Sequence, residues 1–192
     1  MCSSDLVVYV GGLGPHKNLA RVIEAFASVP HAERGRAPRL VLVGDHGADV
    51  FHSDEAGLRA LASALAGDRV VFAGPLSDDV LARLLAGARA LILASLDEGF
   101  GLPLVEAAAC GTPVIATRRS AAPEVLGDAA LYVDPLDVAS IAAALAHALG
   151  EAELRTTLGV RGAERAARLS WRRTAERLEA VFDTVASGSV RT

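Results

Sequence analysis

Two kinds of hydrophobic pattern alternate along the chain. Short runs of consecutive apolar residues are typical of strands that are buried on both faces of a parallel sheet. Six such runs occur, at residues 6–10, 39–43, 70–72, 90–94, 113–117 and 130–133. Between them, apolar residues recur three or four positions apart, which is the spacing of amphipathic helices. The pattern therefore predicts strands that alternate with helices.

The predicted helices have identifiable starts and apolar faces. Residue types that cap helix N-termini precede four of them, and these are Asn18, Ser77, Asp137 and Ser170. The positions that we expect to be buried are Leu19, Val22, Ile23 and Phe26 in the first helix, Leu58, Leu61 and Leu65 in the second, and Val80, Leu81, Leu84 and Leu85 in the third. Further helices are expected at residues 103–110, 123–126, 138–149, 151–169 and 171–186, and a loop at 46–54. We expect Trp171 to pack the last helix against the rest of the protein.

Strands that alternate with helices predict a doubly wound α/β fold, a parallel Rossmann-like sheet of about six strands. In the common strand order 3-2-1-4-5-6, the first and fourth strands are neighbours, and ligands bind where the order reverses. Two glycine-rich turns follow these two strands, at residues 11–18 and 95–103. We therefore expect the two turns to meet on opposite sides of one ligand site.

The second turn carries two carboxylates. Glu98 and Glu106 are separated by seven residues, with Glu98 in the turn and Glu106 about one turn into the helix. Gly99 and Gly101 let backbone N–H groups approach a ligand, and the start of a helix favours negative charge. Free amides flanked by carboxylates suit a ligand that is both anionic and rich in hydroxyl groups, such as a sugar nucleotide.

The first turn carries Lys17, which is the only lysine in the chain. A cation gains nothing from the dipole at a helix start, so we interpret Lys17 as a ligand of a diphosphate rather than a solvated side chain. His16 beside it is interpreted as a loop residue rather than a base. The turn has neither the full dinucleotide fingerprint nor the Walker pattern.

Composition narrows the classes of protein that fit. The 192 residues are 52% hydrophobic and 22% charged, as expected of one soluble domain. A net charge of -4 without a basic run argues against nucleic acid or an anionic membrane as the main partner. No apolar run approaches the ~20 residues needed to span a bilayer, and the first residues do not resemble a signal peptide. Cys2 and Cys110 are far apart, which favours a reducing cytosol without disulfides or a metal cluster, and Cys110 is expected to be buried.

The ends of the chain differ from its centre. We expect residues 6–186 to form one domain. Residues 1–5 are polar and precede a strand directly, so we interpret them as a foreign or truncated start. Residues 187–192 are expected to fray. A natural N-terminal part is then missing, and the reading frame upstream of Leu6 in an intact genome would test this.

The motifs resemble those of a known family. Glu98 and Glu106 with the Gly-Phe-Gly between them, followed by residues 111–116 and 123–125, closely resemble the donor-binding, C-terminal half of GT-B retaining glycosyltransferases of family 4, or group 1. The turn at residues 9–19 is similar to the first phosphate loop of its mannosyltransferase-like members, which build O-antigen and other cell-surface polysaccharides. The resemblance covers residues 6–186.

The resemblance implies roles for individual residues. Lys17 would contact the diphosphate of the donor, and Glu98 would accept hydrogen bonds from the transferred sugar, so both are catalytic candidates. Glu106 would accept from the ribose hydroxyls. The other donor-binding positions are Gly12 in the first turn, Gly99, Phe100, Gly101 and Leu102 at the sugar and phosphate, and Val71 and Phe72 at the base. Many relatives carry an arginine where this chain has Gly12, and Arg118 is a candidate to compensate.

The resemblance also implies a reaction. The donor would be a GDP-, UDP- or ADP-sugar, and the sugar would be transferred with retention of configuration. No metal or other cofactor is expected, because amides, lysine and a helix start neutralise the departing diphosphate. The acceptor and an important histidine would belong to a missing N-terminal domain, so we expect the isolated chain to bind donor without transferring sugar.

Two alternatives remain open at this point. One is a non-catalytic, nucleotide-binding regulatory or interaction module of the same fold. The other is an NAD-dependent enzyme in which Asp45, after the second strand, binds ribose. The incomplete glycine fingerprint argues against the second. For the full-length protein we expect a cytoplasmic location, with peripheral association at the inner face of the membrane through the missing half as a further alternative.

Overall fold

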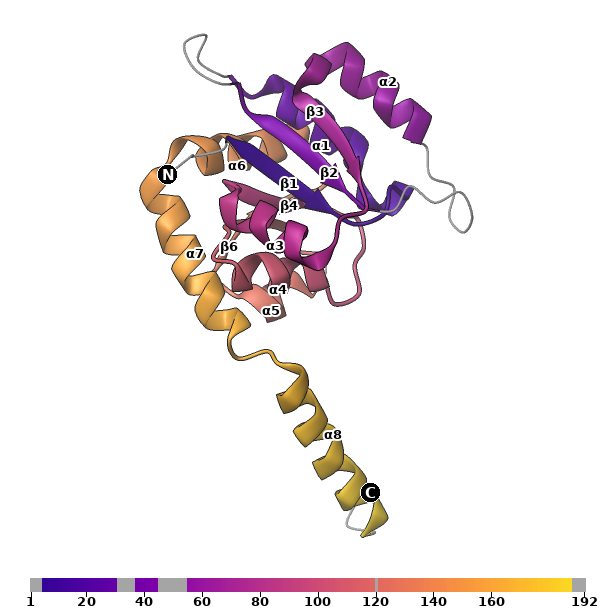
Figure 1. Ribbon diagram of the computed structural model, residues 1–192, viewed down its shortest axis with the longest axis vertical. Helices are drawn as coiled ribbons and strands as arrows, with labels where there is room; N and C mark the ends of the chain where they lie inside the picture. The colour runs from indigo at the N-terminus through magenta and orange to yellow at the C-terminus, as the bar shows by residue number, and fades with distance from the viewer. Residues whose placement is uncertain (1–4, 31–36, 45–54, 120, 188–192) are drawn as a thin grey trace.

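A parallel sheet organises the part of the chain that the computed structural model describes, which is residues 5–30, 37–44, 55–119 and 121–187 (Figure 1). Within these residues, six strands pair in the order β3-β2-β1-β4-β5-β6, and every pairing is parallel. They are β1 (Leu6–Val10), β2 (Arg39–Val43), β3 (Val70–Gly74), β4 (Ala90–Leu93), β5 (Val114–Thr117) and β6 (Ala130–Val133). The predicted α/β fold and strand order are confirmed.

The expectations for Cys2, for Asp45, for the loop at residues 46–54, and for the end residues 1–4 and 188–192 concern positions outside the described residues. Of the predicted frayed tail, the structure describes Ser187, which follows the last helix as its C-cap.

Helices cover both faces of the sheet (Figure 1). They are α1 (Leu19–Ser28), α2 (Glu55–Ala66), α3 (Asp78–Gly87), α4 (Leu102–Ala109), α5 (Ala122–Leu126), α6 (Val138–Gly150), α7 (Ala152–Ala166) and α8 (Trp171–Ala186), with short 3-10 turns η1 (Pro15–Lys17) and η2 (Gly67–Arg69). Helix α1 packs against α2 and α6, whereas α4 packs against α3, α5 and α7. The central strands are therefore enclosed, which is why their sequences are continuously apolar.

Two of the four predicted helix caps form as expected. Asp137 accepts a hydrogen bond from the backbone N–H of Ala139 at 2.9 Å, and Ser170 accepts from that of Arg173 at 3.2 Å. Ser77 and Asn18 occupy N-cap positions, but neither side chain makes a capping hydrogen bond. The carboxamide of Asn18 is used for long-range contacts instead, as described below.

The predicted apolar faces hold best for α1, whose four predicted residues are all buried. In α2, Leu65 is exposed and Ala62 and Ala66 are buried in its place. In α3, Leu85 is buried while Val80 is exposed. Helix α2 contacts β3, an edge strand of the described sheet, whereas α3 contacts β1 and α4. Each of the two helices buries a narrower face than its sequence suggests.

Cys110, which we expect from the sequence to be buried, is half-buried at the C-cap of α4. Burial, followed by the negative charge of Glu106, raises the pKa of its thiol above the ordinary value. Gly111 follows with a φ of +72° and ends the helix as predicted.

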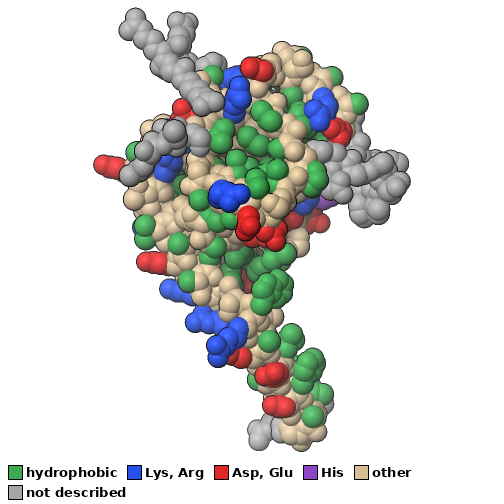
Figure 2. All heavy atoms as spheres, in the orientation of Figure 1, with side chains coloured by type: hydrophobic (Ala, Val, Ile, Leu, Met, Phe, Trp, Pro, Cys, Tyr) green, Lys and Arg blue, Asp and Glu red, His purple; other side chains and the backbone are tan. Residues whose placement is uncertain are grey.

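Helix α8 contradicts the expectation for Trp171. The helix extends away from the sheet and its covering helices (Figure 1), none of its residues is buried, and Trp171 is 79% exposed. Other exposed apolar residues of the same helix are Leu178, Val181, Phe182 and Val185. Figure 2 shows apolar side chains along this projecting helix. Trp171 has no apolar surface to pack on among the described residues, since α8 leaves the body at that point.

No helix within the described residues has the length and apolar character needed to cross a membrane.

The ends of β1 and β2 approach each other closely. The N–H of Gly11 donates to the carbonyl oxygen of Val43 at 2.9 Å. Gly44 follows with a φ of +151°, and a Cβ at that position would lie 2.0 Å from the carbonyl oxygen of Gly11. Gly44 therefore needs both a glycine conformation and the absence of a side chain.

We expect Gly44→Ala to lower the free energy of unfolding by more than about 2 kcal/mol, because it combines backbone strain with a clash against backbone. Urea unfolding followed by circular dichroism would measure the loss. Gly12→Ala is the matched control: no atom lies within 4 Å of its Cβ position and its φ is not positive, so its stability should change by less than about 1 kcal/mol. Equal stability of the two variants would contradict this account of the turn.

Candidate functional site

The turns that follow β1 and β4 meet at the carboxyl-terminal edge of the sheet. Strands β1 and β4 are paired in parallel, so their ends lie side by side. The N–H of Leu96 donates to the carbonyl oxygen of His16 at 2.8 Å. The Nζ of Lys17 lies 2.5 Å from Oε1 of Glu98. The prediction that the two turns come together is confirmed.

The ion pair of Lys17 and Glu98 is largely shielded from water. The side chains are 18% and 12% exposed, respectively. The hydroxyl of Ser95, which is fully buried, donates to the same Oε1 of Glu98 at 2.9 Å. Charge-assisted hydrogen bonds of this kind are stronger than neutral ones, and partial burial limits screening by salt. The carboxylate is thus held by one buried hydroxyl and one ammonium group.

Local backbone structure directs Lys17 toward the second turn. Pro15, His16 and Lys17 form η1, in which the N–H of Lys17 donates to the carbonyl oxygen of Gly14 at 2.9 Å. Asn18 then adopts a left-handed conformation with φ 60° and ψ 29°, and α1 begins at Leu19. The 3-10 turn and the left-handed residue together reverse the chain between β1 and α1.

Tyr9 on β1 holds the first turn through a hydrogen bond, a role that the sequence analysis missed. Its side chain is buried, and its hydroxyl donates to the carbonyl oxygen of Gly12. Burial, followed by the negative charge of Glu98, raises the pKa of the Tyr9 hydroxyl well above its ordinary value of 10.0. A tyrosine one residue before the end of a buried strand, just ahead of a glycine turn, was the available signal.

Gly12 leaves room for a side chain. It is exposed, its φ is not positive, and a Cβ built there has open space around it. A longer side chain, such as the arginine that the family resemblance implies, would therefore fit at this position. Arg118, the candidate to compensate for that arginine, has its guanidinium 4.3 Å from the centre of the Tyr132 ring. No described contact joins Arg118 to Lys17 or Glu98.

The second turn presents an uncapped helix start. Gly101 precedes α4 with a φ of +77°, and a Cβ there would lie 2.7 Å from Cδ1 of Leu104. No side chain caps the helix. Pro103 has no N–H and that of Leu104 donates to the carbonyl oxygen of Gly101 at 2.9 Å, so the N–H of Leu102 is the donor that this helix start offers to a ligand. Gly99, Phe100 and Leu102 are exposed around it. These positions have the accessibility that their expected contacts with sugar and phosphate require.

The remaining predicted residues lie apart from the ion pair. Glu106 is exposed on α4 and has no ion pair among the described residues. Val71 and Phe72 lie on β3, which is separated from β1 by β2, and the Phe72 ring packs under the guanidinium of Arg59 at 4.3 Å. The structure thus brings Lys17 and Glu98 into contact but does not join Glu106, Val71 or Phe72 to them.

Within the part of the chain that the structure describes, no group of three or more His, Cys, Asp and Glu side chains is arranged to hold a metal ion.

The chain matches one protein family over most of its length. Residues 3–165 match the family model described as Glycosyl transferases group 1. An O-antigen chain mannosyltransferase B from Escherichia coli is 34% identical over 167 residues, which cover 85% of this chain and 42% of that protein. A D-inositol 3-phosphate glycosyltransferase from Acidothermus cellulolyticus is 36% identical over 183 residues, which cover 92% of this chain and 40% of that protein.

Solved structures share the fold. A sucrose-phosphate synthase from Thermosynechococcus elongatus superposes with a TM-score of 0.81 at 30% identity, covering 95% of this chain and 46% of that one. Anabaena HepE, solved in complex with UDP and glucose, superposes with a TM-score of 0.78 at 23% identity, covering 93% of this chain and 49% of that one. The chain spans less than half the length of each of these relatives.

The raised pKa of Tyr9 predicts an alkaline loss of stability. The unfolded chain ionises its tyrosines near pH 10, whereas the folded chain keeps Tyr9 protonated, so the free energy of unfolding should fall as pH rises through about 10. Part of this fall should be absent in Tyr9→Phe. The check is urea unfolding between about pH 8 and pH 10.5, together with the absorbance of the ionised phenol. A Tyr9 that ionises at the same pH in folded and unfolded protein would contradict the expectation.

Proposed function

The chain belongs to the glycosyl transferases of group 1, a family of GT-B fold, and from this premise we propose that it binds the nucleotide-diphosphate sugar donor of such an enzyme. The observation that carries the proposal is the partly buried ion pair of Lys17 and Glu98, held between the turns after β1 and β4. It sets an ammonium group and a carboxylate side by side at the edge where doubly wound folds bind ligands.

Each proposed contact follows from charge and position. Lys17 and the uncapped start of α4 offer positive charge to a diphosphate. Glu98 offers a carboxylate to the sugar hydroxyls, and the exposed Glu106 offers one to the ribose. We place the phosphate or sugar beside Gly12, Gly99, Phe100, Gly101 and Leu102. The base would lie toward β3, beside Val71 and Phe72.

Donor binding would exchange the partners of the ion pair. Without ligand, Lys17 and Glu98 neutralise each other at 2.5 Å. A diphosphate carries more negative charge than one carboxylate, so it competes for Lys17, while sugar hydroxyls donate to the released Glu98. The same ammonium group and the helix start then stabilise the diphosphate as it departs, which is electrostatic catalysis that requires no metal ion.

The whole protein's activity is a further part of the proposal. Since the chain spans 42% of the Escherichia coli mannosyltransferase, we assign it to the C-terminal, donor-binding half of a longer enzyme. An N-terminal domain would supply the acceptor and a histidine, and the sugar would be transferred with retention. The name of the Escherichia coli relative favours a role in cell-surface polysaccharide synthesis, and we propose that the whole protein acts at the cytoplasmic face of the membrane. The isolated chain would bind donor and transfer no sugar.

The site assignment predicts which variants lose binding. A nucleotide sugar at about 100 times its dissociation constant should add about 2.7 kcal/mol of stability, and Lys17→Ala and Glu106→Ala should each reduce that gain. Thermal unfolding with UDP-, GDP- and ADP-sugars and with NAD measures it. Arg172→Ala, on the projecting α8, is the control and should retain the full shift. If Lys17→Ala and Glu106→Ala both bind like the unmodified chain, the assignment is wrong; a shift with NAD alone would favour a dehydrogenase.

Exchange of partners predicts an unusual effect of Glu98→Gln. Because glutamine keeps the shape but frees Lys17, the nucleoside diphosphate should bind about two- to tenfold more tightly. The nucleotide sugar should lose most of its advantage over the diphosphate, since the amide is a weaker acceptor than the carboxylate. Isothermal titration calorimetry with both ligands measures the two changes.

Glu124→Gln, an exposed glutamate in α5, is the control for the loss of one negative charge. It should change neither affinity. Equal weakening of both ligands by Glu98→Gln would argue against the exchange. A chain that binds the diphosphate and the nucleotide sugar equally well before any substitution would favour the non-catalytic nucleotide-binding module.

A further inference from the structure

Asn18 stands out among the residues beside the ion pair. Among the described residues it is the one non-glycine residue with positive φ, and it is 4% exposed. Asparagine tolerates this conformation better than most residues but is still less suited to it than glycine. Asn18 occupies the N-cap of α1 without capping it. A glycine would satisfy the backbone, so the side chain must account for the asparagine.

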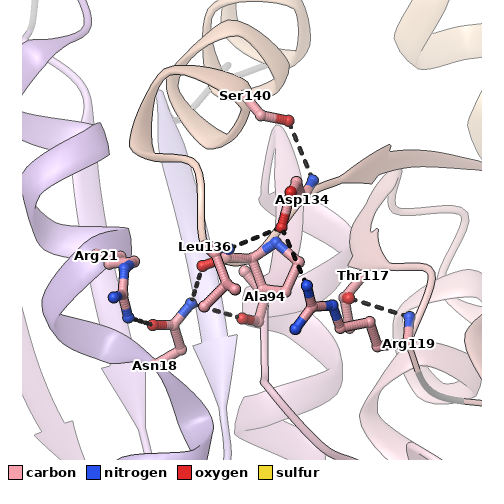
Figure 3. Close-up of polar contacts among 9 residues, drawn as sticks. Asn18, Arg21, Ala94, Thr117, Arg119, Asp134, Leu136 and Ser140 are labelled. Atoms are coloured by element: carbon pink, nitrogen blue, oxygen red, sulfur yellow. Dashed lines mark hydrogen bonds and ion pairs between the residues drawn. The ribbon is translucent and has the colours of Figure 1, made fainter.

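The carboxamide of Asn18 joins three loops (Figure 3). Its Nδ2 donates to the carbonyl oxygen of Ala94 at 3.0 Å and to that of Pro135 at 2.6 Å, and its Oδ1 accepts from Arg21 at 3.0 Å. Both amide hydrogens are therefore engaged by carbonyl groups that follow different strands, β4 and β6. Only a side chain with two donors on one nitrogen satisfies both carbonyl groups at once.

The loop between β6 and α6 is itself braced. The N–H of Leu136 donates to Oδ1 of Asp134 at 2.9 Å, and the N–H of Asp134 donates to the hydroxyl of Ser140 at 3.1 Å. Arg119, which follows β5, lies 3.8 Å from the same Asp134 carboxylate (Figure 3). The carbonyl of Pro135 is thus presented to Asn18 by a fixed turn.

These contacts connect Asn18 to the chain on both sides of the ion pair. Asn18 follows Lys17 in the chain, and Ala94 precedes Ser95, whose hydroxyl holds Glu98. The carboxamide therefore links the backbone next to Lys17 to the backbone next to Ser95, whose hydroxyl holds Glu98. The Leu96 to His16 backbone hydrogen bond is the other described polar link between the two turns that does not involve the charged groups.

We infer that Asn18 is a positioning residue for donor binding: its carboxamide sets the separation of Lys17 and Glu98 and so determines how well a diphosphate sugar fits between them. The inference rests on the proposed function for the identity of the ligand. The geometry on which it depends can be tested without any ligand, because Lys17 is the only lysine in the chain.

Two substitutions remove the link in different ways. Asn18→Gly keeps the left-handed backbone and deletes the carboxamide. Asn18→Asp keeps the shape and the acceptor for Arg21, but it turns an oxygen toward two carbonyl groups. Arg21→Ala is the matched control, because it removes a contact of Asn18 that reaches neither loop. Val7→Ala, in the buried first half of β1, is a control for lowered stability alone.

The experiment has two readouts. Reductive methylation with ¹³C-formaldehyde gives Lys17 a single side-chain NMR signal besides that of the N-terminus, which reports its surroundings without ligand. Calorimetry with UDP-glucose, GDP-mannose and ADP-glucose gives the dissociation constant. We expect both Asn18 variants to shift the Lys17 signal and to weaken binding at least about tenfold, the loss equivalent to one hydrogen bond. Arg21→Ala and Val7→Ala should leave both readouts close to those of the unmodified chain.

The two readouts separate two kinds of failure. If the unmodified chain binds a nucleotide sugar, and Asn18→Gly binds equally well with an unchanged Lys17 signal, the positioning role is overturned. If neither the unmodified chain nor any variant binds a nucleotide sugar, the proposed function fails. If the Lys17 signal nevertheless moves in the Asn18 variants alone, the positioning geometry stands. If Val7→Ala has the same effects as Asn18→Gly, the effect is one of stability and the inference is rejected.

A measurement on the unmodified chain covers the case in which the variants do not fold. Both side-chain amide protons of Asn18 should lie downfield of those of a solvated carboxamide and exchange slowly with water, because each is bonded to a different buried carbonyl group. Addition of the nucleotide sugar that binds should move these signals together with that of Lys17. Asn18 amide protons that have the shifts and fast exchange of a solvated carboxamide, and that do not respond to ligand, would overturn the inference.

Discussion

The parallel pairing of β1 with β4 is the constraint on which the rest of the structure depends. Strands that are far apart in the sequence end side by side, because the strand order reverses between them. The turns that leave them must then share one small volume, whatever their sequences. In this chain one turn contributes an ammonium group and the other a carboxylate, and the proposed chemistry depends on that encounter. The hydrophobic pattern of the strands therefore determines where the charged residues meet.

The sheet could be predicted from the sequence because enclosed strands are apolar at every position, a local signal that needs no knowledge of partners. The bounds of β1, β2 and β6 match the prediction residue for residue. Side chains at the surface of an element were harder to predict. Leu65 has the right spacing to be buried, yet α2 uses alanines against the core. Trp171 is the first residue of an amphipathic helix. The sequence pattern does not tell whether another part of the protein covers the apolar face of that helix.

The site was predictable in outline and not in its connections. Lys17 and Glu98 were identified from their turns, as groups for opposite ends of a ligand, and they contact each other directly. Asn18 was assigned a local capping role because its residue type favours one. Its partners lie 76 and 117 residues away, a distance over which a single sequence carries no pairing signal. Tyr9 was overlooked for a related reason. A buried tyrosine is interpreted as a core residue until the hydrogen-bond partner of its hydroxyl is known.

Helix α8 divides the chain thermodynamically. Its 16 residues bury no side chain, so the hydrophobic term that stabilises every other long helix of the described chain contributes little to it. A helix of this length is only marginally stable in water by itself. Amide hydrogen exchange along residues 171–186 should therefore report a local helix–coil equilibrium, while exchange in β1 and β4 reports opening of the entire sheet. The chain has one fold but two scales of protection, and the boundary between them lies near Ser170.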